Sequence, residues 1–302
     1  MDSVLTLITN SAARERGAVL DDTTVSSVQK ALQALAIETA SADWLADGEA
    51  VDIPFAGHAA AEAEAAVRQA LGAAPIDVIA QSVYRRKKKL LIADMDSTIV
   101  VGETLDELAA FAGVKDKISA ITQRAMRGEL DFAEALHERV AMLKGLDESC
   151  LAETMAAVKL TPGATSLIAT MRAHGAFTAL ISGGFSYFTD QVRQSVGFDS
   201  SLGNQLAIEN GKLTGQVIPP IVDKDTKCIM LIDTAEQMGL GMSDTMAIGD
   251  GANDVPMLTA AGTGIAFHAH PVAREAARAR LDVADLHGAL FIQGYRRDEF
   301  VN

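Results

Sequence analysis

Two aspartates stand one residue apart directly after a short apolar run, in the stretch KKLLIADMDST. The run predicts a buried strand, which puts Asp94 and Asp96 at its carboxyl end, where parallel sheets bind ligands. In an extended segment, residues two apart project to the same side. Both carboxylates can therefore face one substrate, one as a nucleophile and the other as a general acid and base. A water nucleophile activated by a metal ion is the alternative that these residues leave open.

Further polar groups follow other predicted strands. Ser182 stands in SGG after FTALI, and Asp250 and Asp254 stand in GDGAND after MAI. Lys227 lies near the start of a predicted helix. The carboxylates offer the hard oxygen ligands that suit Mg²⁺. The serine hydroxyl, the N–H groups of the following glycines and the lysine ammonium suit phosphate. Each motif alone reads as a turn or a solvated surface, but together on one sheet edge they predict phosphoryl transfer.

The segment from 85 to 302 is predicted to form an α/β domain with a Rossmann-like parallel sheet, because short apolar runs alternate with helical stretches. An all-helical stretch at about 103–160 separates the first two strands of this sheet. It is far longer than a simple crossover requires. We interpret it as a helical cap insertion. The stretch 204–218 predicts a hairpin that turns at Asn210-Gly211.

Residues 1–84 are predicted to form a small α+β domain of the ferredoxin-like, ACT-like kind, because the order of elements is βαββαβ. The predicted elements are strands at 3–9, 37–45, 49–55 and 75–83 and helices at 23–36 and 58–72. A module of this shape either binds an amino acid as a regulatory domain or serves only in folding and dimerisation. No ligand motif decides between these functions. A homodimer fits the module, and the sequence leaves the oligomeric state open.

The composition excludes several classes of protein. The chain has 302 residues and a net charge of −14, so its overall field disfavours nucleic acid and anionic membranes. The basic cluster 85–89 is interpreted as a solvated linker, with a nucleic-acid contact as the alternative. Neither a signal peptide nor an apolar run long enough for a membrane span is recognised. The two cysteines, Cys150 and Cys228, lack metal-ligand spacing, which favours a reduced, cytoplasmic protein.

The motifs DMDST, SGG and GDGAND, with Lys227 between the last two, resemble those of the haloacid dehalogenase superfamily over roughly residues 88–295. The resemblance implies that Asp94 is the nucleophile and Asp96 the general acid and base. It implies that Ser182, with the N–H of Gly183, and Lys227 bind the phosphoryl group.

The same resemblance implies a Mg²⁺ site. Its ligands would be Asp94, the backbone carbonyl of Asp96 and Asp250. Asn253 and Asp254 would support this site, and Asn253 would also lie against the substrate.

The longer stretches DMDSTIVVGETLDELA, AMRGELDFAEALHERVAMLKGL, LTPGA, SGGF and IGDGANDVPML resemble the bacterial phosphoserine phosphatases. This resemblance implies hydrolysis of O-phospho-L-serine, the last step of serine biosynthesis. Glu103 would then bind the substrate ammonium, and Arg139 the substrate carboxylate through bidentate hydrogen bonds. From the residues alone, Glu103 reads as an acid favoured at a helix N-terminus and Arg139 as a surface arginine.

Two other functions stay open at this point. One is another small-molecule phosphatase of the same superfamily, because a fold does not fix a substrate. The other is an amino-acid-sensing regulatory protein whose second domain is catalytically silent. The intact set of Asp94, Asp96, Asp250 and Lys227 argues against the sensor.

Overall fold

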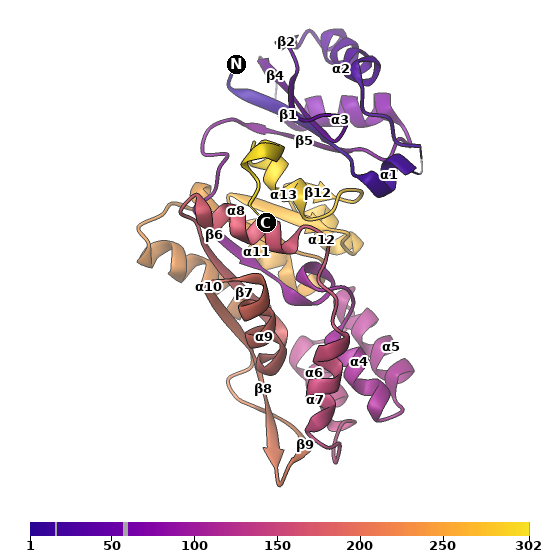
Figure 1. The fold of residues 1–302 in the computed structure, drawn as a ribbon, viewed down its shortest axis with the longest axis vertical. Coiled ribbons are helices and arrows are strands. Elements are labelled where there is room, and N and C mark those ends of the chain that lie inside the picture. Colours follow the sequence, from indigo (N-terminus) through magenta and orange to yellow (C-terminus); the bar gives the residue numbers. More distant parts are fainter. Residues whose placement is uncertain (16, 57–59, 302) are drawn as a thin grey trace.

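The computed structural model describes the chain except for residues 16, 57–59 and 302. A small sheet with its helices lies at one end of the molecule, and a larger sheet lies in the middle (Figure 1). A group of helices and a long hairpin lie at the other end. Among the described residues, no helix has both the length and the apolar composition to span a bilayer.

The small sheet is antiparallel, with the strand order β2-β4-β1-β5, and β3 also pairs with β4. Its elements in chain order are β1 (Ser3–Ile8), α1 (Ser11–Glu15), α2 (Asp22–Ala34), β2 (Glu38–Thr39), β3 (Asp43–Ala46), β4 (Ala50–Ala56), α3 (Ala60–Leu71) and β5 (Asp77–Ser82). Val28 and Leu32 of α2 and Val67 of α3 are fully buried in one cluster with Leu5 and Leu7 of β1. Both helices therefore cover the same face of the sheet.

The predicted strand 37–45 is wrong as a single element. The structure has two short strands there, because β2 pairs with Phe55 and Ala56 of β4 whereas β3 pairs with its other half, Ala50–Asp52. The helix predicted at 58–72 is confirmed over Ala60–Leu71, and its first two residues lie outside the described residues. The short helix α1 was not predicted.

The large sheet has seven strands in the order β12-β11-β10-β6-β7-β8-β9, and only the β8–β9 pair is antiparallel. The predicted parallel sheet is therefore confirmed. Its strands are β6 (Leu90–Ala93), β7 (Phe177–Phe185), β8 (Ser200–Glu209), β9 (Lys212–Ile218), β10 (Thr245–Gly249), β11 (Thr263–Phe267) and β12 (Ala279–Leu281). Its central strands β6, β10 and β11 are almost wholly buried, as expected of a sheet covered on both faces.

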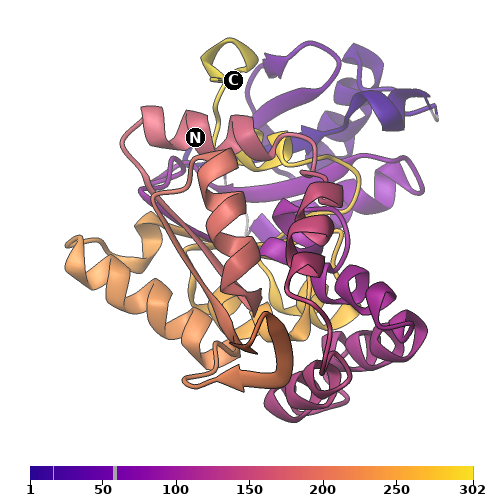
Figure 2. The same cartoon turned by 60° about the horizontal axis from the view of Figure 1, so that its bottom comes forward.

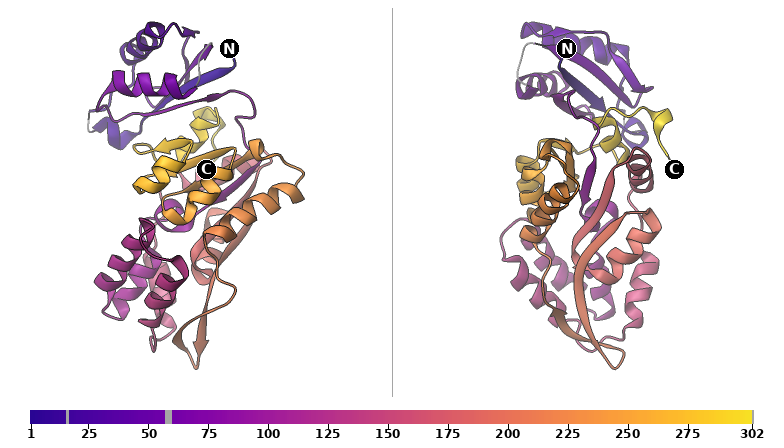
Figure 3. Two further views of the ribbon diagram at one scale, coloured as in Figure 1. Left: turned by 180° about the vertical axis from the view of Figure 1, so that it is seen from behind. Right: turned by 90° about the vertical axis from the view of Figure 1, so that its left-hand side faces the viewer.

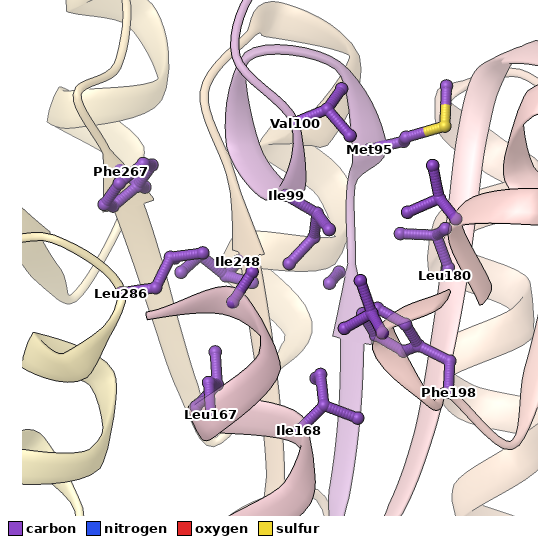
Figure 4. Packing of buried hydrophobic residues seen from close by; sticks show 14 of the residues in the cluster. Met95, Ile99, Val100, Leu167, Ile168, Leu180, Phe198, Ile248, Phe267 and Leu286 are labelled. Carbon is purple, nitrogen blue, oxygen red and sulfur yellow. The ribbon is translucent and has the colours of Figure 1, made fainter. Parts of the chain in front are cut away.

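Helices cover the large sheet on both faces (Figure 3, right). They are α8 (Ala164–Ala173), α9 (Ser186–Val196) and α13 (His287–Ile292) on one face and α10 (Lys224–Gln237), α11 (Val255–Ala260) and α12 (Pro271–Ala276) on the other. Figure 4 shows the first face, where Leu167 and Ile168 of α8 pack near Ile248 of β10 and Leu180 of β7. This packing fixes the carboxyl ends of the strands relative to one another.

Between β6 and α8 the chain forms four helices, which we call the helical insertion. They are α4 (Thr104–Phe111), α5 (Lys115–Met126), α6 (Phe132–Ala141) and α7 (Ser149–Ala157). The segments that enter and leave the insertion pair with each other at Val100 and Leu160. The hairpin β8–β9 lies beside the insertion (Figure 2).

Backbone hydrogen bonds join the hairpin to the loop between α6 and α7. The N–H of Gly145 donates to the carbonyl of Leu213 over 2.8 Å, and the N–H of Leu213 donates to Leu146 over 2.9 Å. The N–H of Glu148 donates to Gly211 over 2.9 Å. The hairpin is thus part of the same packed unit as the insertion.

The basic segment 85–89 lies in the junction between the two sheets. Arg85, Lys87 and Lys89 are exposed, as expected of a solvated linker, but Arg86 and Lys88 are not. Arg86 is its most connected side chain. It forms a salt bridge with Asp52 of β4 and donates to Thr6 of β1 over 2.8 Å. It also donates to the carbonyls of Phe291 and Ile292 at the end of α13, over 3.0 and 2.7 Å. Arg86 thereby joins the small sheet to the C-terminal part of the chain.

A second junction contact is made by Asp77 at the start of β5. Its buried carboxylate accepts the backbone N–H groups of Asp282, Val283 and Ala284 at 2.8–3.2 Å. Asn10 donates to the carbonyl of Val283 over 2.7 Å. Buried polar groups are thus paired across the junction, which gives the two sheets a defined relative position.

Candidate active site

The predicted polar residues meet at the carboxyl edge of the large sheet. Asp94 follows β6, Ser182 lies near the end of β7 and Asp250 follows β10, and these three strands are neighbours. One cavity is lined by seven of the predicted residues, namely Asp94, Asp96, Glu103, Arg139, Ser182, Gly183 and Asn253. The other three, Lys227, Asp250 and Asp254, are buried beside Asp94. Residues that are distant in sequence are therefore brought together as predicted.

The spacing of Asp94 and Asp96 predicted that both lie in one extended segment. The structure differs from this prediction. The strand ends at Ala93, and residues 95–99 form an irregular helical turn in which Ser97 has a φ of 55°. The turn still directs both carboxylates into the cavity. One oxygen of Asp96 accepts the N–H of Thr104 over 2.8 Å, which leaves its other oxygen facing Ser182 Oγ at 3.4 Å.

Lys227 lies between two carboxylates. Its Nζ is 2.7 Å from Asp94 Oδ1 and 2.7 Å from Asp254 Oδ1, and its side chain has no exposed surface. Burial disfavours the ammonium, but the two neighbouring carboxylates raise the pKa of Lys227 above its usual value. The lysine is therefore a fixed positive charge beside Asp94.

Asp254 supports the loop that carries Asp250. Its Oδ2 accepts the N–H groups of Asp250 and Gly251, each over 3.1 Å. Gly249 is required at the turn, because a Cβ there would lie 2.4 Å from Cγ of Asp254. Both oxygens of Asp254 are thus already engaged, one by these N–H groups and one by Lys227.

A cation fits among these carboxylates. Oxygens of Asp94, Asp250 and Asp254 lie within 4.8 Å of one another. Burial raises the pKa of Asp94 to about 7 and that of Asp250 well above its usual value, because Lys227 offsets only part of the negative charge. Asn253 Oδ1 is buried without a hydrogen-bond partner in the described structure. Clustered hard oxygens that lack compensating charge suit a divalent ion such as Mg²⁺.

Side chains of the helical insertion form one wall of the cavity. The ring of Phe132, at the start of α6, lies against Gly183, where an added Cβ would be 2.4 Å from the ring. Gly184 is also tightly placed, since a Cβ there would lie 2.7 Å from Asp96 Oδ2. The cavity has a volume of about 30 Å³, which is room for about one water molecule. The structure therefore represents a closed arrangement.

Two ionisable groups of opposite sign face the cavity from the insertion side. Glu103 precedes α4, makes no helix-capping hydrogen bond and accepts the hydroxyl of Ser97 over 2.8 Å. Burial raises its pKa to about 8. Arg139 of α6 is only 3% exposed and forms no ion pair with a described carboxylate. Arg139 is therefore not a surface arginine, and Glu103 lies at the start of a helix but faces the cavity.

Sequence reasoning missed the groups that hold Arg139. Its Nε donates to the carbonyl of Ala135 over 3.0 Å, and its Nη1 donates to Thr122 Oγ1 over 3.0 Å. Thr122 in turn lies 2.8 Å from Asp106 Oδ1. Because the Thr122 hydroxyl donates its hydrogen bond to Asp106, a lone pair on Oγ1 is left to accept the hydrogen bond from Arg139. Neither Asp106 nor Thr122 belongs to a motif, so the sequence does not indicate that they support Arg139.

Comparison with known proteins agrees with this geometry. The family model of the haloacid dehalogenase-like hydrolases matches residues 91–259. The chain therefore belongs to this family of hydrolases. Within it, the chain is similar to phosphoserine phosphatases. A phosphoserine phosphatase of Streptomyces coelicolor is 45% identical over 224 residues, which cover 74% of this chain and 55% of that protein. The chain thus spans about half the length of this relative.

Two solved structures are also similar. A phosphoserine phosphatase with a phospho-aspartyl intermediate analogue is 37% identical with a TM-score of 0.66, covering 68% of this chain and 98% of that one. A probable phosphoserine phosphatase from Vibrio cholerae, in its unliganded form, is 30% identical with a TM-score of 0.77. That match covers 99% of this chain and 88% of the other, so it includes the small N-terminal sheet.

Proposed function

We propose that this protein is a Mg²⁺-dependent phosphoserine phosphatase that hydrolyses O-phospho-L-serine to L-serine and phosphate. One observation carries the proposal. A half-buried carboxylate, Glu103, and a buried guanidinium, Arg139, line the same cavity as Asp94 and Asp96. An amino-acid phosphate has an ammonium and a carboxylate for the first pair and a phosphoryl group for the second. The phosphoserine phosphatases to which the chain is similar support this substrate.

In the first half of the reaction, a carboxylate oxygen of Asp94 attacks phosphorus and the bond to the seryl oxygen breaks. Asp96 delivers a proton to the leaving alkoxide, and burial, which raises the pKa of this carboxyl, favours that role. Lys227, already 2.7 Å from Asp94, offsets negative charge as the phosphoryl group approaches. The Ser182 hydroxyl and the Gly183 N–H would hold the phosphoryl oxygens. The products of this step are serine and an aspartyl-phosphate.

In the second half, water attacks phosphorus and Asp96, now a carboxylate, accepts its proton. The acyl-phosphate bond breaks, which restores the Asp94 carboxylate and releases phosphate. A phospho-aspartyl intermediate analogue in a similar phosphoserine phosphatase supports this covalent route.

Asp94, Asp250 and the backbone carbonyl of Asp96 would hold the Mg²⁺, with Asn253 and Asp254 in support. Asp250 is the freer carboxylate, because both oxygens of Asp254 already accept other hydrogen bonds. When bound, Mg²⁺ would supply positive charge beside the phosphoryl oxygens.

The helical insertion would act as a cap that opens for substrate and product. The closed cavity, about 30 Å³, is too small for phosphoserine. Closure over bound substrate would exclude bulk water from the aspartyl-phosphate.

We assign residues 1–84 to an N-terminal domain and 85–302 to the catalytic domain, with the insertion at about 103–160. The strand order of the small sheet supports a ferredoxin-like, ACT-like module. A homodimer, a cytoplasmic location and a role in the last step of serine biosynthesis remain predictions.

The test is phosphate release from O-phospho-L-serine with Mg²⁺, beside a panel of sugar and nucleotide phosphates. We expect phosphoserine to be preferred and Asp94→Asn to lose at least about 10³-fold in kcat. Asp190→Asn, at an exposed position of α9, is the matched control and should keep full activity. Faster turnover of another phosphate would show that Glu103 and Arg139 are misassigned. No turnover of any phosphate would favour an amino-acid sensor.

A further inference from the structure

A second cavity is much larger than that of the candidate active site. It has a volume of about 780 Å³ and lies between α3 and β5 of the small sheet and the amino ends of strands of the large sheet. Lys88, just before β6, Thr263 at the start of β11 and Ala279 at the start of β12 all line it. The cavity is therefore at the opposite edge of the large sheet from Asp94.

Four cations line this cavity, namely Arg68, Lys88, Arg278 and Arg280. Of the described lining residues, Glu64 is the one carboxylate. Its oxygens are already engaged by Arg68, at 3.0 Å, and by the N–H of Ala80, at 3.1 Å. In a chain with a net charge of −14, this excess of positive charge on one cavity wall is unusual and attracts anions.

Three of the cations lack an anionic partner among the described residues. Lys88, only 6% exposed, donates to the carbonyl of Ser243 over 2.8 Å. Arg278 makes a long contact of 3.4 Å with the carbonyl of Gly262. Burial lowers the pKa of Lys88 to about 8, with Asp244 opposing this shift and Arg278 adding to it. Positive groups held close together without a counter-charge are the arrangement that a bound anion would complete.

Part of the remaining wall is apolar, beside polar side chains such as Gln81 and Ser243. Ala61 and Ala65 of α3, Ile79 of β5 and Ala279 of β12 leave room and offer no charge. A volume of this size is typical of sites for small organic molecules. The cavity therefore suits a ligand with an apolar body and several negative charges.

We propose that this cavity, which we call the junction cavity, binds a small organic polyanion through Lys88, Arg278 and Arg280. The ligand touches both sheets, so its binding stabilises their docked arrangement. Polycarboxylates and organic phosphates share the required chemistry.

The test is calorimetric titration of the metal-free protein with citrate and, separately, with ATP at low ionic strength. Without metal, the candidate active site holds more carboxylates than cations and disfavours both probes. We expect at least one probe to bind with a dissociation constant of about 1 mM or less and to raise the melting temperature. Binding should weaken as salt is added. Binding of citrate alone would identify a polycarboxylate, and binding of ATP alone a phosphate ester.

Two double variants distinguish binding in the junction cavity from attraction by the overall charge of the protein. Arg278→Gln with Arg280→Gln should weaken binding about tenfold or more. Arg193→Gln with Lys224→Gln removes the same charge from α9 and α10 and should change binding less than about twofold. Ala65→Trp fills the cavity without a change of charge and should also weaken binding.

Three results would overturn the proposal. They are no binding of either probe at 10-fold above the expected dissociation constant (~10 mM), equal weakening in the two double variants, and unchanged binding in Ala65→Trp. Circular dichroism of each variant would confirm that it is folded.

Discussion

The two edges of the large sheet differ in how their charged side chains are paired. At the carboxyl edge, Lys227 has no exposed surface and lies 2.7 Å from each of two carboxylates, beside a cavity of about 30 Å³. At the amino edge, Arg278 and Arg280 have no carboxylate partner among the described residues and line about 780 Å³. Charges that leave water must be paired within the protein, whereas charges on an open cavity can be solvated. Substitution of Lys227 should therefore lower the free energy of unfolding far more than substitution of Arg278 or Arg280.

The largest expected effect comes from Lys227→Met. It leaves Asp94 and Asp254 buried without their cation, which should lower the free energy of unfolding by about 3 kcal/mol or more. Phosphate release from phosphoserine should fall by at least about 10³-fold. Lys224→Met, on the same helix and exposed, should change neither quantity. Urea unfolding and phosphate release measure both, and a stable, active Lys227→Met protein would contradict the assigned role of the ion pairs.

Arg86→Met tests the junction without touching the candidate active site. Asp52, 6% exposed, loses the partner that neutralises it, so the free energy of unfolding should fall by about 2–4 kcal/mol. The value of kcat should stay within about twofold. The neighbouring Arg85→Met is the control, because its salt bridge with Asp244 is exposed and contributes less than about 1 kcal/mol. Equal destabilisation by both variants would show that Arg86 does not join the two sheets.

Thr122→Val tests the support of Arg139. Of the hydrogen bonds that the variant removes, the one to Arg139, worth about 1 kcal/mol, should raise the KM for phosphoserine about fivefold and leave kcat nearly unchanged. Thr154→Val is a matched control in the same insertion. Thr154 is equally buried, and its hydroxyl has no partner in the described structure. A fall in kcat with constant KM would place Thr122 in a different role.

The smallest expected effect is a pH dependence. Burial raises the pKa of Glu103 to about 8, so below this pH the group is mostly protonated and cannot pair with an ammonium. The kcat/KM for phosphoserine should therefore rise about fivefold from pH 7 to pH 8. Phosphoglycolate has no ammonium and should lack this rise, as should Glu103→Gln with phosphoserine. A rise of the same size for both substrates would assign it to another group.

The carboxyl edge could be predicted largely from sequence. Asp94, Ser182 and Asp250 each follow an apolar run, and parallel strands bring their carboxyl ends to one edge. Lys227 has no local signal and could be assigned only in combination with the other motifs. The contact between Thr122 and Asp106 could not be predicted, because it depends on how α4 and α5 cross.

The amino edge was not predicted for a related reason. Arg86 lies 34 residues from Asp52 and more than 200 from Phe291, and no periodic pattern joins positions so far apart. A run of five cations therefore reads as solvated when only its neighbours in sequence are known. The split of 37–45 into β2 and β3 likewise depends on two halves of β4, which form pairs at different places.

The hydrogen bonds between the β8–β9 hairpin and the insertion limit how the insertion can move. The two segments that connect the insertion to the large sheet pair with each other at Val100 and Leu160, so they must bend together. Gly145 and Glu148 bond to the hairpin at Leu213 and Gly211, while β8 remains part of the large sheet through β7. Rotation of the insertion must therefore flex the hairpin along its length or break these bonds. If the insertion opens as proposed, bending of the hairpin would oppose the opening and favour return to the closed arrangement.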